Sequence, residues 1–250
     1  MSLSLSARRL LCLAITAAGL VACAAADRAT AQISAAVTRP TMALAEPGEP
    51  FGRSLVRAPD GRLTARWRTV QAEMAAEAPR IAACRAAPAA CPAEAEAFVA
   101  LVDAAAARTG VERLDRLNRA VNETVRFVAD LDQHGVADRW SAPLATLATR
   151  QGDCEDIAIL KYAVLRAAGT PEADLRLLVV RDRWVGDVHA VLSVRDGSRW
   201  YLLDNRWAEP RVDAALPRFA PLFALGAAGV DAYAEPDGPA AAAVLRTAAR

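Results

Sequence analysis

The spacing of apolar residues differs between the first and the second half of the chain. Through the first half, apolar side chains recur every three or four positions, which predicts helices over residues 63–80, 93–107 and 111–128. A fourth helix is expected to begin near Cys154 and to end before Gly169. The helical part of the fold therefore comes first along the chain.

Short β-type segments follow these helices. They predict strands over residues 175–181, 188–195 and 199–205, and a further apolar patch covers residues 219–225. Asp196-Gly197, between the second and third strands, is a strong signal for a two-residue hairpin turn. Helices followed by an antiparallel meander are typical of the α+β class.

The same pattern sets the expected domain organisation. Residues 32–62 carry several prolines and glycines with little periodicity, which indicates a linker. Residues 63–226 are expected to form one folded domain, and the alanine- and proline-rich residues 227–250 a tail.

Residues 1–31 have the features of an export signal. Arg8 and Arg9 precede an apolar stretch, Leu10 to Ala22, that is too short to cross a bilayer comfortably. Small residues follow, so that cleavage is expected after Ala26 or Ala31.

A second interpretation of this segment remains open. Leu20-Val21-Ala22-Cys23 also fits a bacterial lipobox, in which Cys23 would be lipidated and would tether the protein to a membrane. Membrane contact is expected only in that case, because no other stretch is long and apolar enough to span a bilayer.

Composition excludes one class of partner. The chain has 250 residues, 54% of them apolar, and its 30 basic and 29 acidic residues leave a net charge of +1. No basic block with interleaved aromatic residues is present, so that we expect no nucleic-acid partner.

Export changes the interpretation of the cysteines. In an oxidising compartment Cys84 and Cys91 can close a small disulfide loop, although two small surface cysteines are the alternative. Cys154 would then remain unpaired, which marks it as a potentially reactive thiol.

Cys154 lies where the fourth helix is expected to start. Free amides and the positive end of the helix dipole lower the pKa of a thiol at such a place and favour the nucleophilic thiolate. An inert cysteine at the edge of the core is the structural alternative.

The predicted hairpin supplies a base for this thiol. With Asp196-Gly197 as the turn, counting back along both strands places His189 directly opposite Asp204, with Cβ atoms about 5 Å apart. A carboxylate at that distance can orient and charge-stabilise an imidazole, which predicts a Cys-His-Asp triad. A cross-strand pair without a catalytic task is the alternative.

Acidic residues surround the nucleophile. Asp153, Glu155 and Asp156 suit the first turn of a helix for electrostatic reasons alone. Because carboxylates beside a thiolate repel it, a bound hard cation such as Ca²⁺ is the second explanation.

Taken together, these motifs resemble a known family. Gln151-Gly152-Asp153-Cys154-Glu155-Asp156, followed by His189-Ala190-Val191 and Leu203-Asp204-Asn205, is similar to the bacterial transglutaminase-like cysteine proteases, the LapG-type periplasmic adhesin proteases. The resemblance extends from about Trp67 to Phe223. It implies a papain-like, transglutaminase-like fold, with an N-terminal helical lobe packed on an antiparallel β-sheet. It also implies catalysis by Cys154, His189 and Asp204, and Ca²⁺ bound by Asp153 and Glu155.

The resemblance further implies a physiological role. Such a protein would be a calcium-dependent periplasmic cysteine endopeptidase that cleaves a large cell-surface adhesin near its N-terminus, at a pair of small residues, and thereby controls biofilm release. An inner-membrane receptor for cyclic di-GMP would inhibit it. Three other functions remain: a protein-glutamine transglutaminase, a catalytically inactive envelope binding module, and a structural envelope lipoprotein.

Overall fold

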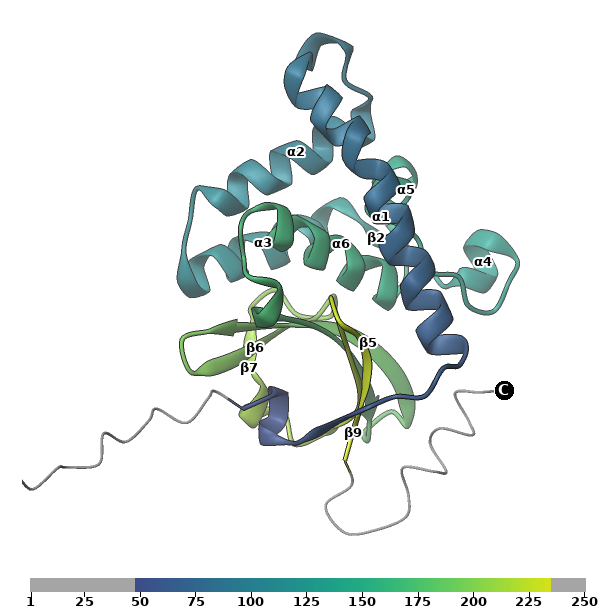
Figure 1. Ribbon diagram of the computed structural model, residues 1–250, viewed down its shortest axis with the longest axis vertical. Coiled ribbons are helices and arrows are strands. Elements are labelled where there is room, and N and C mark those ends of the chain that lie inside the picture. The colour runs from purple at the N-terminus through teal and green to yellow at the C-terminus, as the bar shows by residue number, and fades with distance from the viewer. Residues whose placement is uncertain (1–47, 235–250) are drawn as a thin grey trace, which may run out of the picture. The chain divides into compact units, whose positions relative to one another are not determined.

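The computed structural model describes residues 48–234 (Figure 1). The expected export signal over residues 1–31, Cys23 included, lies outside the described residues, as do most of the expected tail and the first part of the expected linker. None of the helices between residues 48 and 234 combines the length and hydropathy of a membrane span.

Helices dominate the first half of the described chain, as the apolar spacing predicts. They are α1 (Arg62–Ala86), α2 (Ala93–Ala106), α3 (Gly110–Thr124), α4 (Asp130–His134), α5 (Pro143–Thr149) and α6 (Cys154–Ala167). Helix α1 buries Trp67, Val70 and Met74 along one side, and the indole N–H of Trp67 donates to the Gly226 carbonyl at 2.9 Å.

Helix α3 is shorter than its apolar spacing predicts. It ends at Thr124, and Val125 fills the core from an extended backbone. The next residues form β2 (Arg126–Phe127), which pairs in parallel with β3 (Gln151–Gly152). Because residues 126 and 127 pair with β3, helix α3 does not continue through them, and its end lies next to the start of α6.

A seven-stranded antiparallel sheet forms the second layer, in the order β1-β9-β8-β4-β5-β6-β7. Its strands are β1 (Leu55–Arg57), β4 (Leu175–Asp182), β5 (Asp187–Asp196), β6 (Arg199–Leu203), β7 (Arg211–Val212), β8 (Phe219–Gly226) and β9 (Gly229–Tyr233). The α+β class and the helical lobe on an antiparallel sheet are thereby confirmed.

The sheet extends past both predicted domain boundaries. Strand β1 lies in the segment interpreted as a linker, and β9 lies in the segment interpreted as a tail. The two strands pair with each other, with Leu55 opposite Tyr233. The boundaries at residues 63 and 226 are therefore wrong for the folded unit, because strands this short carry too few apolar residues to produce a recognisable pattern.

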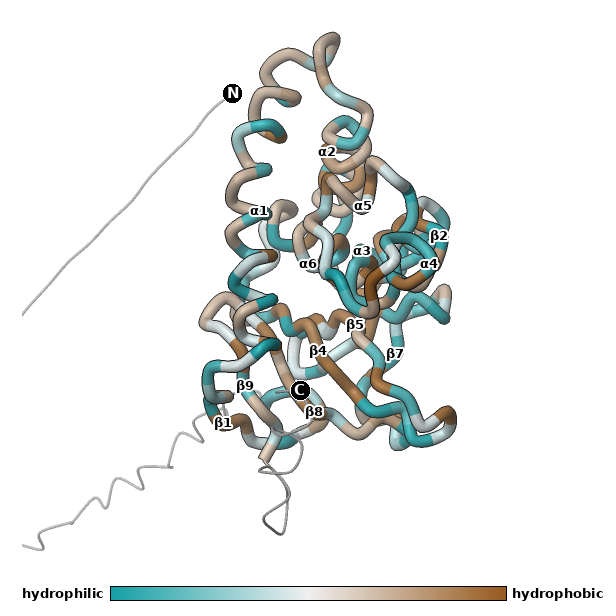
Figure 2. The backbone as a smooth tube through the Cα atoms, turned by 90° about the vertical axis from the view of Figure 1, so that its right-hand side faces the viewer, coloured by the Kyte–Doolittle hydropathy of each residue, from teal (hydrophilic) through white to brown (hydrophobic). Residues whose placement is uncertain are grey.

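Helix α6 lies between the other helices and the sheet, where it contacts β4 and β5. Nearly all of its side chains are buried in the large core that joins the helices to one face of the sheet. The other sheet face encloses a smaller apolar cluster around Leu178, Val191 and Phe219. Apolar segments such as β4 run through the middle of the molecule in Figure 2. A helix held on all sides gives Cys154 a rigid position.

A disulfide joins Cys84, near the end of α1, to Cys91, just before α2, with Cα atoms 4.5 Å apart. This confirms the predicted pairing. Among the described residues Cys154 is the free cysteine.

Candidate active site

Cys154 is the first residue of α6, immediately after the β3 residue Gly152 and the cap residue Asp153. A Cβ on Gly152 would lie 2.7 Å from the Cβ of Asp156, too close for any side chain. Glycine at this position therefore allows the first turn of α6 to fold back onto β3 and fixes where the thiol emerges.

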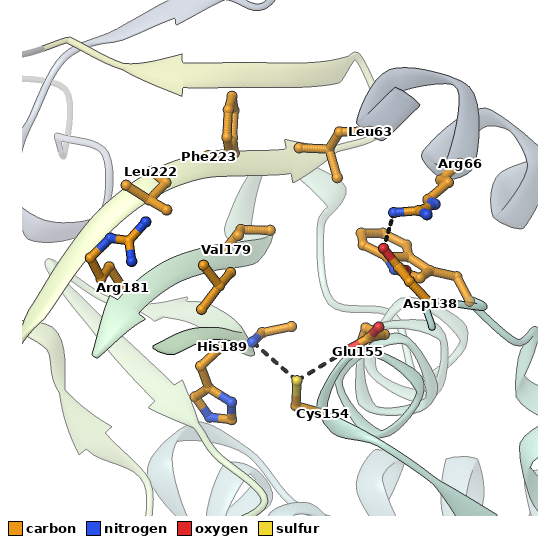
Figure 3. A pocket seen from close by; sticks show the side chains of 13 residues that line it. Leu63, Arg66, Asp138, Cys154, Glu155, Val179, Arg181, His189, Leu222 and Phe223 are labelled. Atoms are coloured by element: carbon orange, nitrogen blue, oxygen red, sulfur yellow. Dashed lines mark hydrogen bonds and ion pairs between the residues drawn. The ribbon is translucent and has the colours of Figure 1, made fainter. Parts of the chain in front are cut away.

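The sulfur of Cys154 lies between a backbone donor and a carboxylate (Figure 3). The Ala190 N–H points at Sγ from 3.4 Å, and Sγ is 3.1 Å from Oε2 of Glu155. Burial raises the pKa of the Cys154 thiol, and the negative charge of Glu155 raises it further. Burial and the neighbouring carboxylates therefore oppose the effect expected of the helix N-terminus, which lowers the pKa of a thiol.

His189 and Asp204 meet as predicted, although by a different register. The turn consists of Gly197 and Ser198, so that Asp196 pairs with Arg199. Gly197, with a φ of 61°, occupies the first turn position, where this class of hairpin requires a positive φ.

The observed register differs from the predicted one by two residues, so that Asp204 follows the end of β6 and is not directly opposite His189. A shift of the strand register by an even number of residues keeps both side chains on one face of the sheet. Nε2 of His189 lies 3.0 Å from Oδ1 of Asp204, and both side chains are buried.

Cys154 and His189 line the same cleft, of about 300 Å³. Figure 3 shows the imidazole beside the sulfur, and Nδ1 is the ring nitrogen that the contact with Asp204 leaves available. The structure therefore brings all three predicted residues together. The rest of the cleft is lined by Leu63, Arg66, Asp138, Trp140, Glu155, Val179, Arg181, Val188, Ala190, Leu222 and Phe223.

Asp204 is held as a carboxylate. Burial raises its pKa, but the hydrogen bond and charge of His189 and further hydrogen bonds from Arg206 outweigh burial, and the pKa falls to about 2. Arg206 has no counterpart in the sequence-based prediction. Its position two residues after Asp204 is the signal that was available, but an arginine in a loop carries no pattern of its own.

The acidic cluster beside Cys154 is larger than predicted. Asp153, Glu155 and Asp156 lie beside Cys154 as expected, and Asp130 and Asp138 join them, in overlapping groups of three whose ligand atoms lie within 4.8 Å of one another. Asp130 and Asp138 were missed because they come from α4 and the loop after it, distant in sequence. Asp156 belongs to the predicted group of acids around Cys154, but the family resemblance implies only Asp153 and Glu155 as calcium ligands.

These carboxylates fit a hard cation. Oδ1 of Asp130, Oδ1 of Asp153 and Oδ2 of Asp156 are buried and have no hydrogen-bond partner. Burial and neighbouring carboxylates raise the pKa of Asp153, raise that of Glu155 to about 8, and raise that of Asp156 to about 7. Clustered oxygen ligands that lack protein partners are the donor set that Ca²⁺ prefers.

Comparisons with known proteins address the family and the fold of this chain. Residues 74–213 match the family described as bacterial transglutaminase-like cysteine proteinase BTLCP. The calcium-bound structure of Legionella pneumophila LapG is 24% identical, covers 62% of this chain and 88% of that chain, and has a TM-score of 0.50. The EGTA-treated LapG structure is 20% identical, covers 76% of this chain and 99% of that chain, and has a TM-score of 0.49. No curated protein matches.

Proposed function

The chain belongs to the bacterial transglutaminase-like cysteine proteinases, and from this premise we propose that it is a calcium-dependent periplasmic cysteine endopeptidase with Cys154, His189 and Asp204 as its triad. One observation carries the catalytic assignment. The free thiol and the imidazole face one open cleft, and the imidazole is bound from behind by a buried carboxylate, 3.0 Å away. An inert structural cysteine has no need of such a pair.

The geometry assigns a role to each group. Asp204 accepts the Nε2–H of His189, so that Nδ1 is free to take the thiol proton of Cys154. The thiolate attacks the scissile carbonyl, and the imidazolium then protonates the departing amine. Water hydrolyses the thioester with His189 as the base, which regenerates the thiol.

The tetrahedral intermediate requires hydrogen-bond donors. The backbone N–H of Cys154, at the start of α6, is the natural first donor because it is free and lies at the positive end of the helix. Trp140 lines the cleft, and its indole N–H is our candidate for the second donor.

We assign Ca²⁺ to the carboxylates of Asp130, Asp138, Asp153, Glu155 and Asp156, because their oxygens cluster. Asp130, Asp153 and Asp156 each have one buried oxygen without a hydrogen-bond partner, whereas Asp138 also binds Arg66. The bound ion would offset the negative charge next to the thiol and would link the α4 region to the start of α6. The calcium-bound structure of LapG, a protein of similar fold, supports the same assignment.

The substrate and setting follow from the family resemblance. We propose that the substrate is a large cell-surface adhesin, cut near its N-terminus at a pair of small residues, and that cleavage controls biofilm release. An inner-membrane cyclic di-GMP receptor would act as the inhibitor. The Cys84–Cys91 disulfide supports the periplasmic assignment, because such bonds persist in oxidising compartments.

The decisive experiment combines the purified exported protein with the N-terminal fragment of a large adhesin from the same organism. With Ca²⁺ we expect one defined cut, found by mass spectrometry, and no cut by the folded Cys154→Ala variant or in excess EGTA. Cleavage by Cys154→Ala would refute the triad, and full activity in EGTA would refute the calcium assignment. Incorporation of a labelled amine into a glutamine-containing protein, without hydrolysis, would identify a transglutaminase instead.

A further inference from the structure

Asp204 is bound from two directions. On one side, Oδ1 is 3.0 Å from Nε2 of His189. On the other side, the backbone N–H of Arg206 donates to Oδ1 at 2.9 Å, and Nη2 of the same residue donates to Oδ2 at 3.1 Å. Nε of Arg206 lies 3.3 Å from both oxygens. The orientation of the carboxylate is therefore set mainly by Arg206.

The same guanidinium also holds a second carboxylate. Nη1 of Arg206 is 3.0 Å from Oδ2 of Asp182, at the end of β4. The side chains of Asp182 and Asp204 are both fully buried, and Arg206 offsets the repulsion between these two like charges, while Asp182 also binds Arg218. Only a planar fork reaches both at once, which a lysine ammonium does not reproduce.

Aromatic packing restricts the position of Arg206. Its guanidinium carbon lies 5.7 Å from the centre of the Trp207 ring and 5.5 Å from that of Phe219, and these two rings are stacked. Phe219 in turn lies beside His189, with ring centres 6.1 Å apart. Because two carboxylates and two aromatic rings already restrict this side chain, it loses little further conformational entropy when it binds Asp204.

A buried lysine also lies near Asp204 but does not share this role. Lys161 is on α6, and its Nζ is 2.7 Å from Oδ1 of Asn118 and 3.5 Å from the Leu203 carbonyl. It supports the backbone before Asp204 and makes no hydrogen bond to the carboxylate itself.

We propose that Arg206 is a positioning residue of the triad. It fixes the Asp204 carboxylate so that Oδ1 faces Nε2 of His189, which keeps the imidazole proton on Nε2 and leaves Nδ1 to receive the thiol proton of Cys154. The link to turnover rests on the proposed protease function, whereas the link to the imidazole tautomer does not.

The chain offers a matched control. Arg218 binds the same Asp182, at 3.2 Å, and also packs on Trp207 and Phe219, but it makes no contact with Asp204. Arg218→Gln therefore removes an arginine from the same ion-pair cluster without touching the triad carboxylate, whereas Arg206→Gln removes both contacts.

The experiment records nitrogen NMR spectra of the full chain, with calcium, labelled at its two histidines, at a pH where imidazole is neutral. His189→Gln assigns the signals. We expect the Nε2–H tautomer in the unmodified protein and in Arg218→Gln, and a mixture of tautomers in Arg206→Gln. With the adhesin fragment, Arg206→Gln should lower kcat about 10- to 100-fold and change KM much less. Arg206→Lys should recover part of the loss.

An unchanged tautomer in Arg206→Gln, or equal changes in Arg218→Gln, would overturn the proposal. If Arg206→Gln does not fold, Arg206→Lys decides. A reduced kcat with a tautomer mixture then supports positioning, and values equal to those of the unmodified protein refute it. If the unmodified protein cleaves nothing, the protease function fails, and the tautomer comparison still tests the role of Arg206.

Discussion

Replacement of Asp204 by asparagine tests how strongly the triad carboxylate is bound. The change removes a buried charge that accepts hydrogen bonds from His189 and Arg206 and leaves the size of the side chain almost unaltered. The fold is therefore expected to persist, while the free energy of unfolding decreases and the orientation of His189 is lost.

The size of the effect follows from the pKa of Asp204, which falls from its ordinary 3.8 to about 2 in the folded protein. A difference of this size corresponds to about 2.5 kcal/mol of stabilisation of the ionised form. Because the interactions with His189 and Arg206 are what lower this pKa, their loss is included in this figure, and Asp204→Asn should cost about 2.5 kcal/mol at neutral pH.

The pH dependence has a defined sign. Because the folded pKa is depressed, the stabilisation is complete above about pH 4 and is lost as the pH falls towards 2. Urea unfolding of both proteins should therefore show a constant difference from neutral pH down to about 5 and a smaller one near pH 3. Equal free energies of unfolding at pH 7 would refute the interpretation that His189 and Arg206 bind an ionised Asp204.

Three further measurements test other parts of the structure. Asp130→Asn should weaken calcium binding at least about tenfold by calorimetry, because it removes one of the proposed ligands, whereas Asp132→Asn, on the exposed side of the same helix, should leave it unchanged. Gly152→Ala should lower the free energy of unfolding by about 1–3 kcal/mol in urea, while Gly61→Ala, which meets only one atom at 4.0 Å, should not; equal stabilities would contradict the close approach. Replacing both cysteines of the α1–α2 disulfide by serine should cost about 2 kcal/mol in the same assay, and an unchanged midpoint would show that the bond contributes nothing.

The sequence predicted those parts of the molecule whose local pattern agrees with the tertiary structure. Helices α1, α2 and α6 are amphipathic or apolar over several turns and have proline or glycine at their ends, so that their positions could be predicted from the chain alone. Strands β1 and β9 could not, because both are short and β1 pairs with a strand at the other end of the described chain.

The site shows the same division. Cys154, His189 and Asp204 could be named because a helix start and a hairpin are local features, and the pairing survived a two-residue error in register. Asp130, Asp138 and Arg206 could not be assigned, because their roles depend on contacts made in three dimensions by loops without periodicity. Charges assembled by tertiary structure leave no spacing to recognise.

The pairing of β1 with β9 has a consequence for the order of folding. Strand β1 is synthesised early, but its partner β9 ends at Tyr233 and follows late. Until β8 and β9 follow, β4 has an open strand edge, which is a site for wrong pairing and aggregation. The helices and the β4–β6 meander can form from contacts closer in sequence, whereas the closing of the sheet has to wait for nearly the whole chain. The rate of chain synthesis and protection by chaperones should therefore affect the yield of this protein more strongly than its final stability suggests.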